Sequence, residues 1–132
     1  INESMIDSGW LCTFAGVDQA KLFPVIQTIV KEYGKMAKQK IGQEELKKAK
    51  DYFKGKMILS LESSDDKATH FGLQELLMNK ILTIEEVFAK IDKVSSLDLQ
   101  KAAKEMFQEE NLNLALIGPL KEEKQFKKLL KL

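Results

Sequence analysis

The stretch that decides the fold is "SSDDKATHFGLQELLMNKILTIEEVFAKIDKVSSLDL", residues 63–99. It contains three helix starts of one kind, in each of which a hydroxyl side chain is followed three residues later by a carboxylate: Ser63 with Asp66, Thr83 with Glu86, and Ser95 with Asp98. Such a pair satisfies the free backbone N–H groups in the first turn of a helix. The stretch therefore predicts helices near 64–79, 84–92 and 96–107.

Three more helices are predicted outside this stretch. Asp18 can cap a helix that begins at residue 19, and Pro24 predicts a kink or a late start because proline removes a helical hydrogen bond. A second helix begins near Gln43, where apolar residues recur at spacings of three and four. A short helix from about 121 to 130 follows the last apolar stretch.

Two stretches predict strands, "GWLCTFAGV" at 9–17 and "NLNLALI" at 111–117. Both are apolar on both faces, which is typical of a strand that is covered on both sides. Trp10 and Cys12 are expected in the core. Two strands alone make a marginal sheet. The predicted fold is therefore α+β: a helix-rich segment of about six helices and two buried strands, whose sheet is completed by missing upstream residues or by a partner chain.

Length and composition limit the organisation of the chain. With 132 residues, 44% of them apolar, it forms one domain at most, and we expect 1–132 to be a single incomplete domain. It opens on "INESMIDSG", with neither an initiator Met nor a leader, so we expect a piece of a longer protein. No apolar run approaches the roughly 18 residues of a membrane span. We expect a soluble protein without a membrane partner; the compartment stays open, with the cytoplasm favoured.

The charge pattern argues against a nucleic-acid partner. The 21 basic side chains, all of them lysine, nearly cancel the 20 acidic ones. Nucleic-acid-binding domains usually carry a basic surplus on one face. Lysine also lacks the planar fork with which arginine binds phosphate.

The only histidine, His70, lies among Asp65, Asp66 and Glu75 and raises the question of a site. On a helix, Asp66 shares the face of His70, whereas Glu75 is turned about 140° away from it. A helical zinc site needs two histidines four residues apart. We therefore favour a solvated histidine with a weak Asp66 contact over a metal site. The opposite side, with Ala68, Phe71, Gly72 and Leu76, is predicted to face the core.

The other reactive side chains give no site either. Cys12 lies in a predicted core strand without an activating base, and no nucleophile, phosphate-binding or dinucleotide motif occurs. The carboxylates of "EENLNLALIG" and "TIEE" are assigned to caps and turns, with a catalytic pair as the open alternative. We predict no catalytic, cofactor-binding or metal-binding residue in this chain.

Three blocks resemble one known family, the pitrilysin/insulinase-type zinc metallopeptidases, which include the mitochondrial processing peptidase-like proteins. "DSGWLCTFAGVD" at 7–18 is similar to a strand of that family. "QEELKKAKDYFKGKMILSLES" at 43–63 is similar to a helix that follows it. The stretch from 70 to 119, which ends in "NLALIGP", is similar without gaps to the segment before the end of the family's domain.

The resemblance implies the C-terminal part of a metallopeptidase-like domain. Family members cut peptides in a chamber built from two similar halves, and one half carries an inverted zinc motif, His-x-x-Glu-His with a distant Glu. An Arg and a Tyr of the opposing half help to hold the peptide. None of these has a counterpart here, and positions where relatives often carry arginine hold other residues: Lys67, His70, Leu73 and Lys80.

The leading hypothesis is a non-catalytic segment of a zinc-dependent peptidase that completes the domain fold and helps to form the substrate chamber or the interface between halves. Zinc would belong to the parent enzyme. The expected partners are the upstream domain or a second homologous subunit, with a peptide substrate in the full protein. The alternative is an inactive homologue that serves as a scaffold or partner subunit, and a third reading is an unrelated helical interaction domain.

Overall fold

The computed structural model describes residues 2–120 and 123–132, which form two compact units. One unit combines Ile1–Cys12 with Gly42–Ser95, and the other combines Thr13–Ile41 with Ser96–Leu132; we call them the first and the second unit. The described residues form six α-helices, so the prediction of a helix-rich chain is confirmed.

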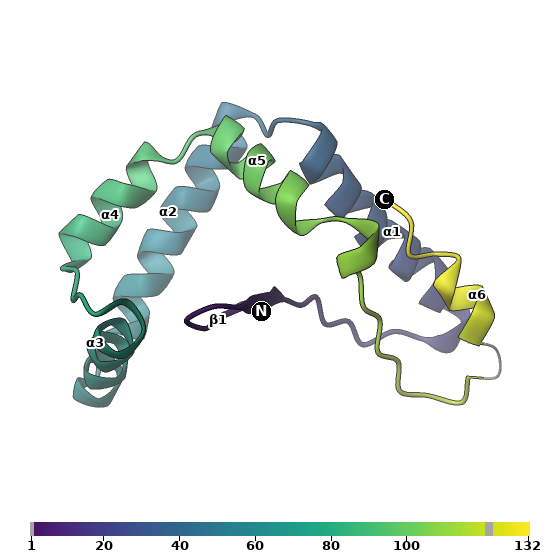
Figure 1. Cartoon of the computed structure of the whole chain (residues 1–132), viewed down its shortest axis with the longest axis horizontal. Helices are drawn as coiled ribbons and strands as arrows, with labels where there is room; N and C mark the ends of the chain where they lie inside the picture. The colour runs from purple at the N-terminus through teal and green to yellow at the C-terminus, as the bar shows by residue number, and fades with distance from the viewer. Residues whose placement is uncertain (1, 121–122) are drawn as a thin grey trace. The chain divides into compact units, whose positions relative to one another are not determined.

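The second unit is built around α1 (Leu22–Lys38), with α5 (Ser96–Met106) and the short α6 (Glu123–Lys127) beside it (Figure 1). Ile26 and Val30 of α1 form its core together with Phe126. The ring of Phe126 also stacks on that of Phe23, with 4.9 Å between the ring centroids. Two short 3-10 helices, η1 (Gln19–Lys21) and η2 (Glu109–Asn111), belong to the same unit.

The start of α1 explains how Pro24 is accommodated. Asp18 caps the 3-10 helix, with its carboxylate accepting from the backbone N–H of Ala20 at 3.1 Å, and the α-helix begins only at Leu22. Pro24 therefore falls in the first turn, where its missing N–H would have no helical partner in any case. The predicted late start is confirmed.

The first unit contains a short hairpin of β1 (Asn2–Ser4) and β2 (Gly9–Leu11), followed by α2 (Gln43–Ser60), α3 (Ser64–Met78) and α4 (Ile84–Lys93). Helices α2 and α4 run side by side (Figure 1). Lys54 Nζ of α2 lies 2.6 Å from the carboxylate of Asp92 in α4 and 5.5 Å from the ring centroid of Phe88. Lys50 Nζ donates to the backbone carbonyl of Asp92 at 2.8 Å.

The predicted caps position the helices of the first unit. The hydroxyl of Ser63 accepts from the backbone N–H of Asp66 at 3.0 Å at the start of α3. Thr83 and Glu86 form a complete capping box at the start of α4, with bonds of 3.2 and 2.8 Å. The predicted starts of α3, α4 and α5 are confirmed. Of the predicted helix at 121–130, residues 121 and 122 lie outside the described residues, and the observed helix ends at Lys127.

The prediction of two buried strands is wrong for this chain. Only residues 9–11 of the stretch 9–17 form a strand; it pairs antiparallel with residues 2–4 and is exposed, with Trp10 at 46%. The stretch 111–117 contains the end of η2 and then no strand. A strand that is apolar on both faces needs neighbours on both edges and covering layers; residues 9–11 have one short neighbour, and residues 111–117 have none among the described residues.

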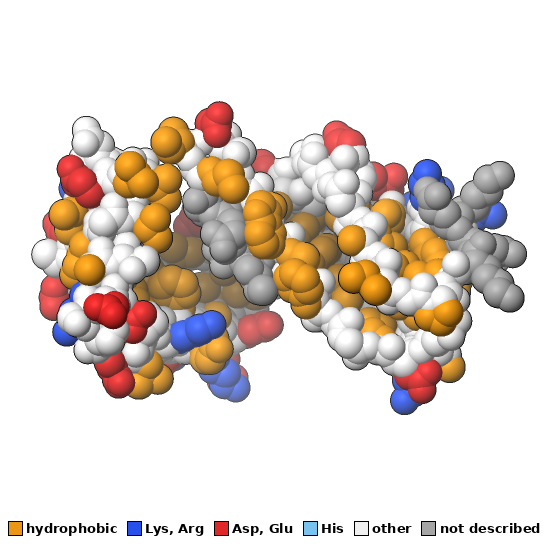
Figure 2. Space-filling model, turned by 90° about the horizontal axis from the view of Figure 1, so that it is seen from below, with side chains coloured by type: hydrophobic (Ala, Val, Ile, Leu, Met, Phe, Trp, Pro, Cys, Tyr) orange, Lys and Arg blue, Asp and Glu red, His pale blue; other side chains and the backbone are white. Residues whose placement is uncertain are grey.

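The described residues bury little apolar surface. Their buried apolar residues, distributed over both units, are Ile26, Val30, Leu46, Leu61, Leu82, Ala103 and Phe126. Many large apolar side chains remain exposed instead, among them Phe14, Tyr52, Leu76 and Ile117, and Figure 2 shows apolar groups at the surface. Both units therefore have apolar surface available for contact with further protein.

Candidate functional site

The structure places His70 differently from the prediction. His70 is half-buried, and its ring Nε2 lies 2.7 Å from the side-chain Nε2 of Gln74, one turn later. Asp66 bonds to the hydroxyl of Ser63 at 2.6 Å instead of the imidazole. The predicted contact between His70 and Asp66 is therefore wrong, because the capping serine is the nearer partner for that carboxylate.

Of the positions predicted to face inward on α3, only Phe71 does so. The half-buried positions of this helix are 70, 71, 74 and 77, whereas Leu76 is 73% exposed. Apolar periodicity alone favoured the side of Leu76. A polar residue, Gln74, lies on the inner face instead, where its side chain accepts a hydrogen bond from the backbone of the loop after α3.

Gln74 connects α3 with the loop that leads to α4. Its Oε1 accepts the backbone N–H of Leu82 at 2.8 Å. Its amide nitrogen can only donate, so the ring Nε2 of His70 accepts and the ring proton lies on Nδ1. Asn79, in the left-handed conformation with φ 50°, ends α3 just before this loop. Asn79 thus fixes the start of the loop, and the bond from Leu82 to Gln74 fixes the loop near its end.

Replacing Gln74 tests this connection. Gln74→Ala is expected to lower the free energy of unfolding by about 1–3 kcal/mol, because the half-buried N–H of Leu82 loses its partner. His70→Ala is expected to cost less, since the bond to Leu82 remains. Urea unfolding measures both changes, with Glu75→Ala on the same helix as the control. Equal losses for all three variants would contradict the role of Gln74.

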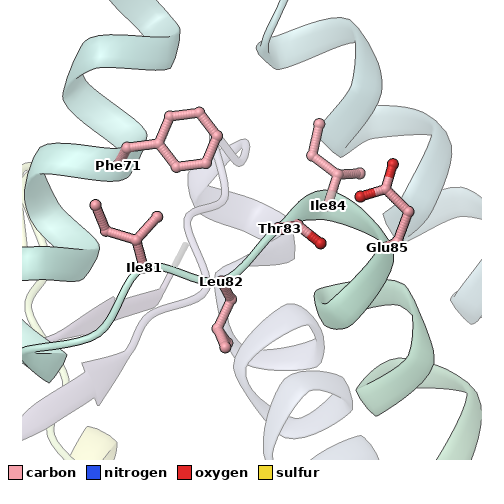
Figure 3. A pocket seen from close by; sticks show the side chains of 6 residues that line it. All are labelled: Phe71, Ile81, Leu82, Thr83, Ile84 and Glu85. Carbon is pink, nitrogen blue, oxygen red and sulfur yellow. The ribbon is translucent and has the colours of Figure 1, made fainter.

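The loop and its flanking helices line an open apolar pocket of about 520 Å³. Figure 3 shows Phe71, Ile81 and Ile84 around it, while Leu82 points to the other side of the loop. Thr83 and Glu85 supply the only polar side chains of its lining. The pocket is suited to an apolar side chain. It brings together no nucleophile with a base and no pair of carboxylates.

The pKa of the Glu85 carboxyl lies below its ordinary value. Its own backbone N–H and then the hydroxyl of Thr83 donate to the carboxylate and lower this pKa. A carboxylate in the first turn of a helix is also favoured by the helix dipole. The charge at this edge of the pocket is therefore maintained to lower pH than that of an ordinary glutamate.

Thr83→Ala is expected to destabilise the chain by about 0.5–2 kcal/mol at pH 7, because α4 loses its N-cap. It should also raise the pKa of Glu85 toward the ordinary value. Since the pKa of Glu85 is lower in the folded chain, its contribution is present above the unfolded pKa and is lost as the pH falls through the folded pKa.

Carboxyl NMR titration and urea unfolding at pH 7 and pH 3 measure these effects. Thr69→Ala, a matched change at an exposed position inside α3, is the control and should change neither quantity. A pKa of Glu85 that is unchanged by Thr83→Ala would contradict the assigned cause.

The described residues bring together no group of three or more metal-binding side chains. Cys12 is half-buried rather than in a core strand. The acidic pair Glu109 and Glu110 lies in η2, as expected of a turn, and Glu86 is engaged in the capping box. The prediction that this chain holds no catalytic or cofactor-binding residue stays a prediction.

Comparison with known proteins identifies relatives along most of the chain. The uncharacterized zinc protease YmxG of Bacillus subtilis is 31% identical over 118 residues, which is 89% of this chain and 29% of that protein. The chain is homologous to part of the pitrilysin-type zinc peptidases. The mitochondrial-processing peptidase subunit beta of Saccharomyces cerevisiae is 29% identical over 71% of this chain and 20% of its own length. The mitochondrial-processing peptidase subunit alpha-2 of Dictyostelium discoideum is 31% identical over 76% of this chain and 22% of its own length.

The chain thus spans less than a third of each of these relatives. No family model matches it. Within the described residues, no helix has the length and apolar character that a membrane crossing requires.

Proposed function

We propose that this chain is a segment of a zinc-dependent peptidase, namely the C-terminal part of one of its domains. Its role would be structural. It would complete the domain fold and help to form the substrate chamber or the interface between the two halves of the enzyme. The homology to zinc proteases supports the peptidase context. The single observation that carries the structural role is the large amount of apolar surface that the segment leaves exposed.

Several of these apolar side chains are strongly exposed. Phe14 is 71% exposed, Leu76 is 73% exposed, and the side chain of Ile117 is fully exposed. Burying apolar surface stabilises a protein by about 25 cal/mol for each Å², so contact with further protein would be strongly favourable. The expected partners are the upstream domain of the same protein or a second homologous subunit.

The chemistry would belong to the rest of the protein. When bound there, zinc would polarise the scissile carbonyl of a peptide and activate a water molecule. Residues 1–132 contain no His-x-x-Glu-His sequence and only one histidine. The segment would contribute to shape and contact, and the peptide substrate would meet the metal elsewhere.

A second candidate is an inactive homologue that acts as a scaffold or partner subunit. The relatives include proteins named as beta subunits and one named as an alpha subunit of the processing peptidase, which supports a subunit role. An intact zinc motif in the full-length protein favours the peptidase, and a disrupted motif favours the scaffold.

The isolated segment is expected to bind no stoichiometric zinc. Elemental analysis after dialysis against micromolar zinc should give well below one zinc per chain. One tightly bound zinc per chain would contradict the proposal that the zinc site lies outside residues 1–132.

The function itself is tested on the full-length protein with a quenched-fluorescence peptide. Cleavage is expected, together with its loss on chelation and on deletion of the segment. Unchanged cleavage after the deletion would contradict the structural role.

A further inference from the structure

The second unit has an open pocket at which lysine side chains gather; we call it the lysine pocket. It has a volume of about 770 Å³ and lies between α1 and the tail that follows α6. Among the described side chains of its lining, Glu32 is the only acidic one, whereas the basic ones are Lys31, Lys35, Lys38, Lys128 and Lys131. The whole chain has a formal net charge of only +1, so the pocket concentrates positive charge that the rest of the chain balances.

Three of these lysines form a row on α1. Lys31, Lys35 and Lys38 follow one another at spacings of four and three residues, so they share one face of the helix. Lys35 Nζ lies 3.7 Å from the carboxylate of Glu32, and both side chains are more than half exposed. An exposed pair of this kind is weak and is screened by salt. Among the described residues no further ion pair joins this row, so most of its charge is unbalanced.

The tail after α6 brings the other two lysines to α1 (Figure 1). Its leucines pack against the core of the second unit. Leu132 lies beside Gly34 of α1, since a Cβ at Gly34 would be 3.7 Å from the backbone of Leu132. Lys128 and Lys131 alternate with the packed leucines and are exposed. Packing of the tail therefore gathers positive charge from two segments that are far apart in the sequence.

The lysine pocket also has an apolar floor. Val30, which is buried, lines it together with Leu129, Leu132 and the backbone of Gly34. A cleft lined by one sign of charge raises the local concentration of ligands of the opposite sign. The pocket is therefore suited to a ligand that combines negative charges with an apolar group.

The chemistry of the lysine pocket favours carboxylates over phosphate. All of its described cations are lysines, which lack the planar fork with which arginine binds phosphate at two points. A helix binds phosphate at its N-terminus, where backbone N–H groups are free, whereas the row of lysines continues to Lys38, the last residue of α1. Aspartate and glutamate side chains next to an apolar residue match both the charges and the floor.

We propose that the lysine pocket binds an acidic segment of a partner protein, with carboxylate side chains against the lysines and one apolar side chain on the floor. Charge complementarity is the argument for this occupant, because five lysines surround one glutamate. The proposal goes beyond the structural role described above, since it gives the second unit a ligand of its own and assigns it no part in peptide cleavage.

Fluorescence anisotropy of a labelled peptide tests the proposal on the full-length protein, with a chelator present to prevent cleavage. The probe alternates glutamate with leucine, and a second probe has glutamine in place of each glutamate. The glutamate probe is expected to bind at least about ten times more tightly than the glutamine probe. Its affinity should also fall about tenfold between about 0.05 M and 0.5 M salt. Equal binding of the two probes, or no binding of either, would overturn the proposal.

Substitution of the lysines locates the binding site. Lys31→Gln combined with Lys128→Gln is expected to weaken binding of the glutamate probe by about five- to tenfold, whereas arginine at both positions should retain it. Lys101→Gln combined with Lys104→Gln removes the same charge from exposed positions of the second unit outside the pocket, and it is the control. Equal weakening by the two glutamine pairs would show a general effect of charge and overturn the proposal.

Inorganic pyrophosphate distinguishes a peptide site from a phosphate site. It is expected to displace the glutamate probe only at concentrations far above those of the unlabelled peptide. Displacement at the concentration of the peptide would overturn the proposal in favour of a phosphate site.

These results are separable from those of the peptidase assay. Binding of the glutamate probe by a full-length protein that cleaves no peptide would support the acidic partner and contradict the peptidase function. Cleavage that depends on the segment, combined with no binding of the probe, would contradict the acidic partner alone.

Discussion

Ile26→Ala is expected to lower the free energy of unfolding of the chain by about 2–4 kcal/mol. Ile26 is only 5% exposed and forms the core of the second unit with Val30 and Phe126. The truncation removes buried apolar surface and leaves a cavity between α1 and α6. Because few residues in the described part are buried, the loss is a large share of the stability that a domain typically has, about 5–15 kcal/mol.

A matched change at an exposed position isolates the effect of burial. Ile58→Ala removes the same atoms from the last turn of a helix of similar length, but the side chain of Ile58 is 54% exposed. It is expected to change the free energy of unfolding by no more than about 0.5 kcal/mol. Urea unfolding followed by circular dichroism measures both variants. Similar losses for the two would contradict a localised core around Ile26.

The helices could be predicted from the sequence because their start signals are local. A cap such as Thr83 with Glu86 needs only four consecutive residues, and the structure shows both of its hydrogen bonds. Pro24 likewise carries its own geometric constraint, so the late start of α1 followed from one residue. In these places local chemistry and the observed fold agree.

The strands could not be placed in the same way because pairing is not local. The stretches 9–17 and 111–117 have strand composition, but most of their residues have no ladder partner within the described chain. Strand composition alone therefore does not supply the neighbouring strand that a ladder needs.

The polar contacts of α3 could not be predicted from the sequence, for a different reason. Helical phase correctly separated His70 from Glu75, but it could not show that Gln74 would bond both to His70 and to the backbone of Leu82. That choice depends on where the loop after Asn79 returns. No short motif marks a glutamine eight residues before its backbone partner.

Tyr33→Ala is expected to lower the free energy of unfolding by about 2–3 kcal/mol, which is less than for a fully buried aromatic residue because Tyr33 is half-buried. The substitution removes the ring that stacks on Phe107 and the hydroxyl that bonds to Thr13. It should also release Thr13 and Phe107 from their contacts with α1, and urea unfolding measures the total cost.

Tyr33→Phe separates the two contributions of this residue. It retains the stacked ring and loses only the hydroxyl, so the expected cost is about 0.5–1.5 kcal/mol. Thr13→Val should cost a similar amount, and the double variant should cost little more than either single change, because both remove one shared hydrogen bond. Additive costs would show that the hydroxyls of Thr13 and Tyr33 act independently. In that case the hydrogen bond between Thr13 and Tyr33 would add nothing measurable to the stability of the chain.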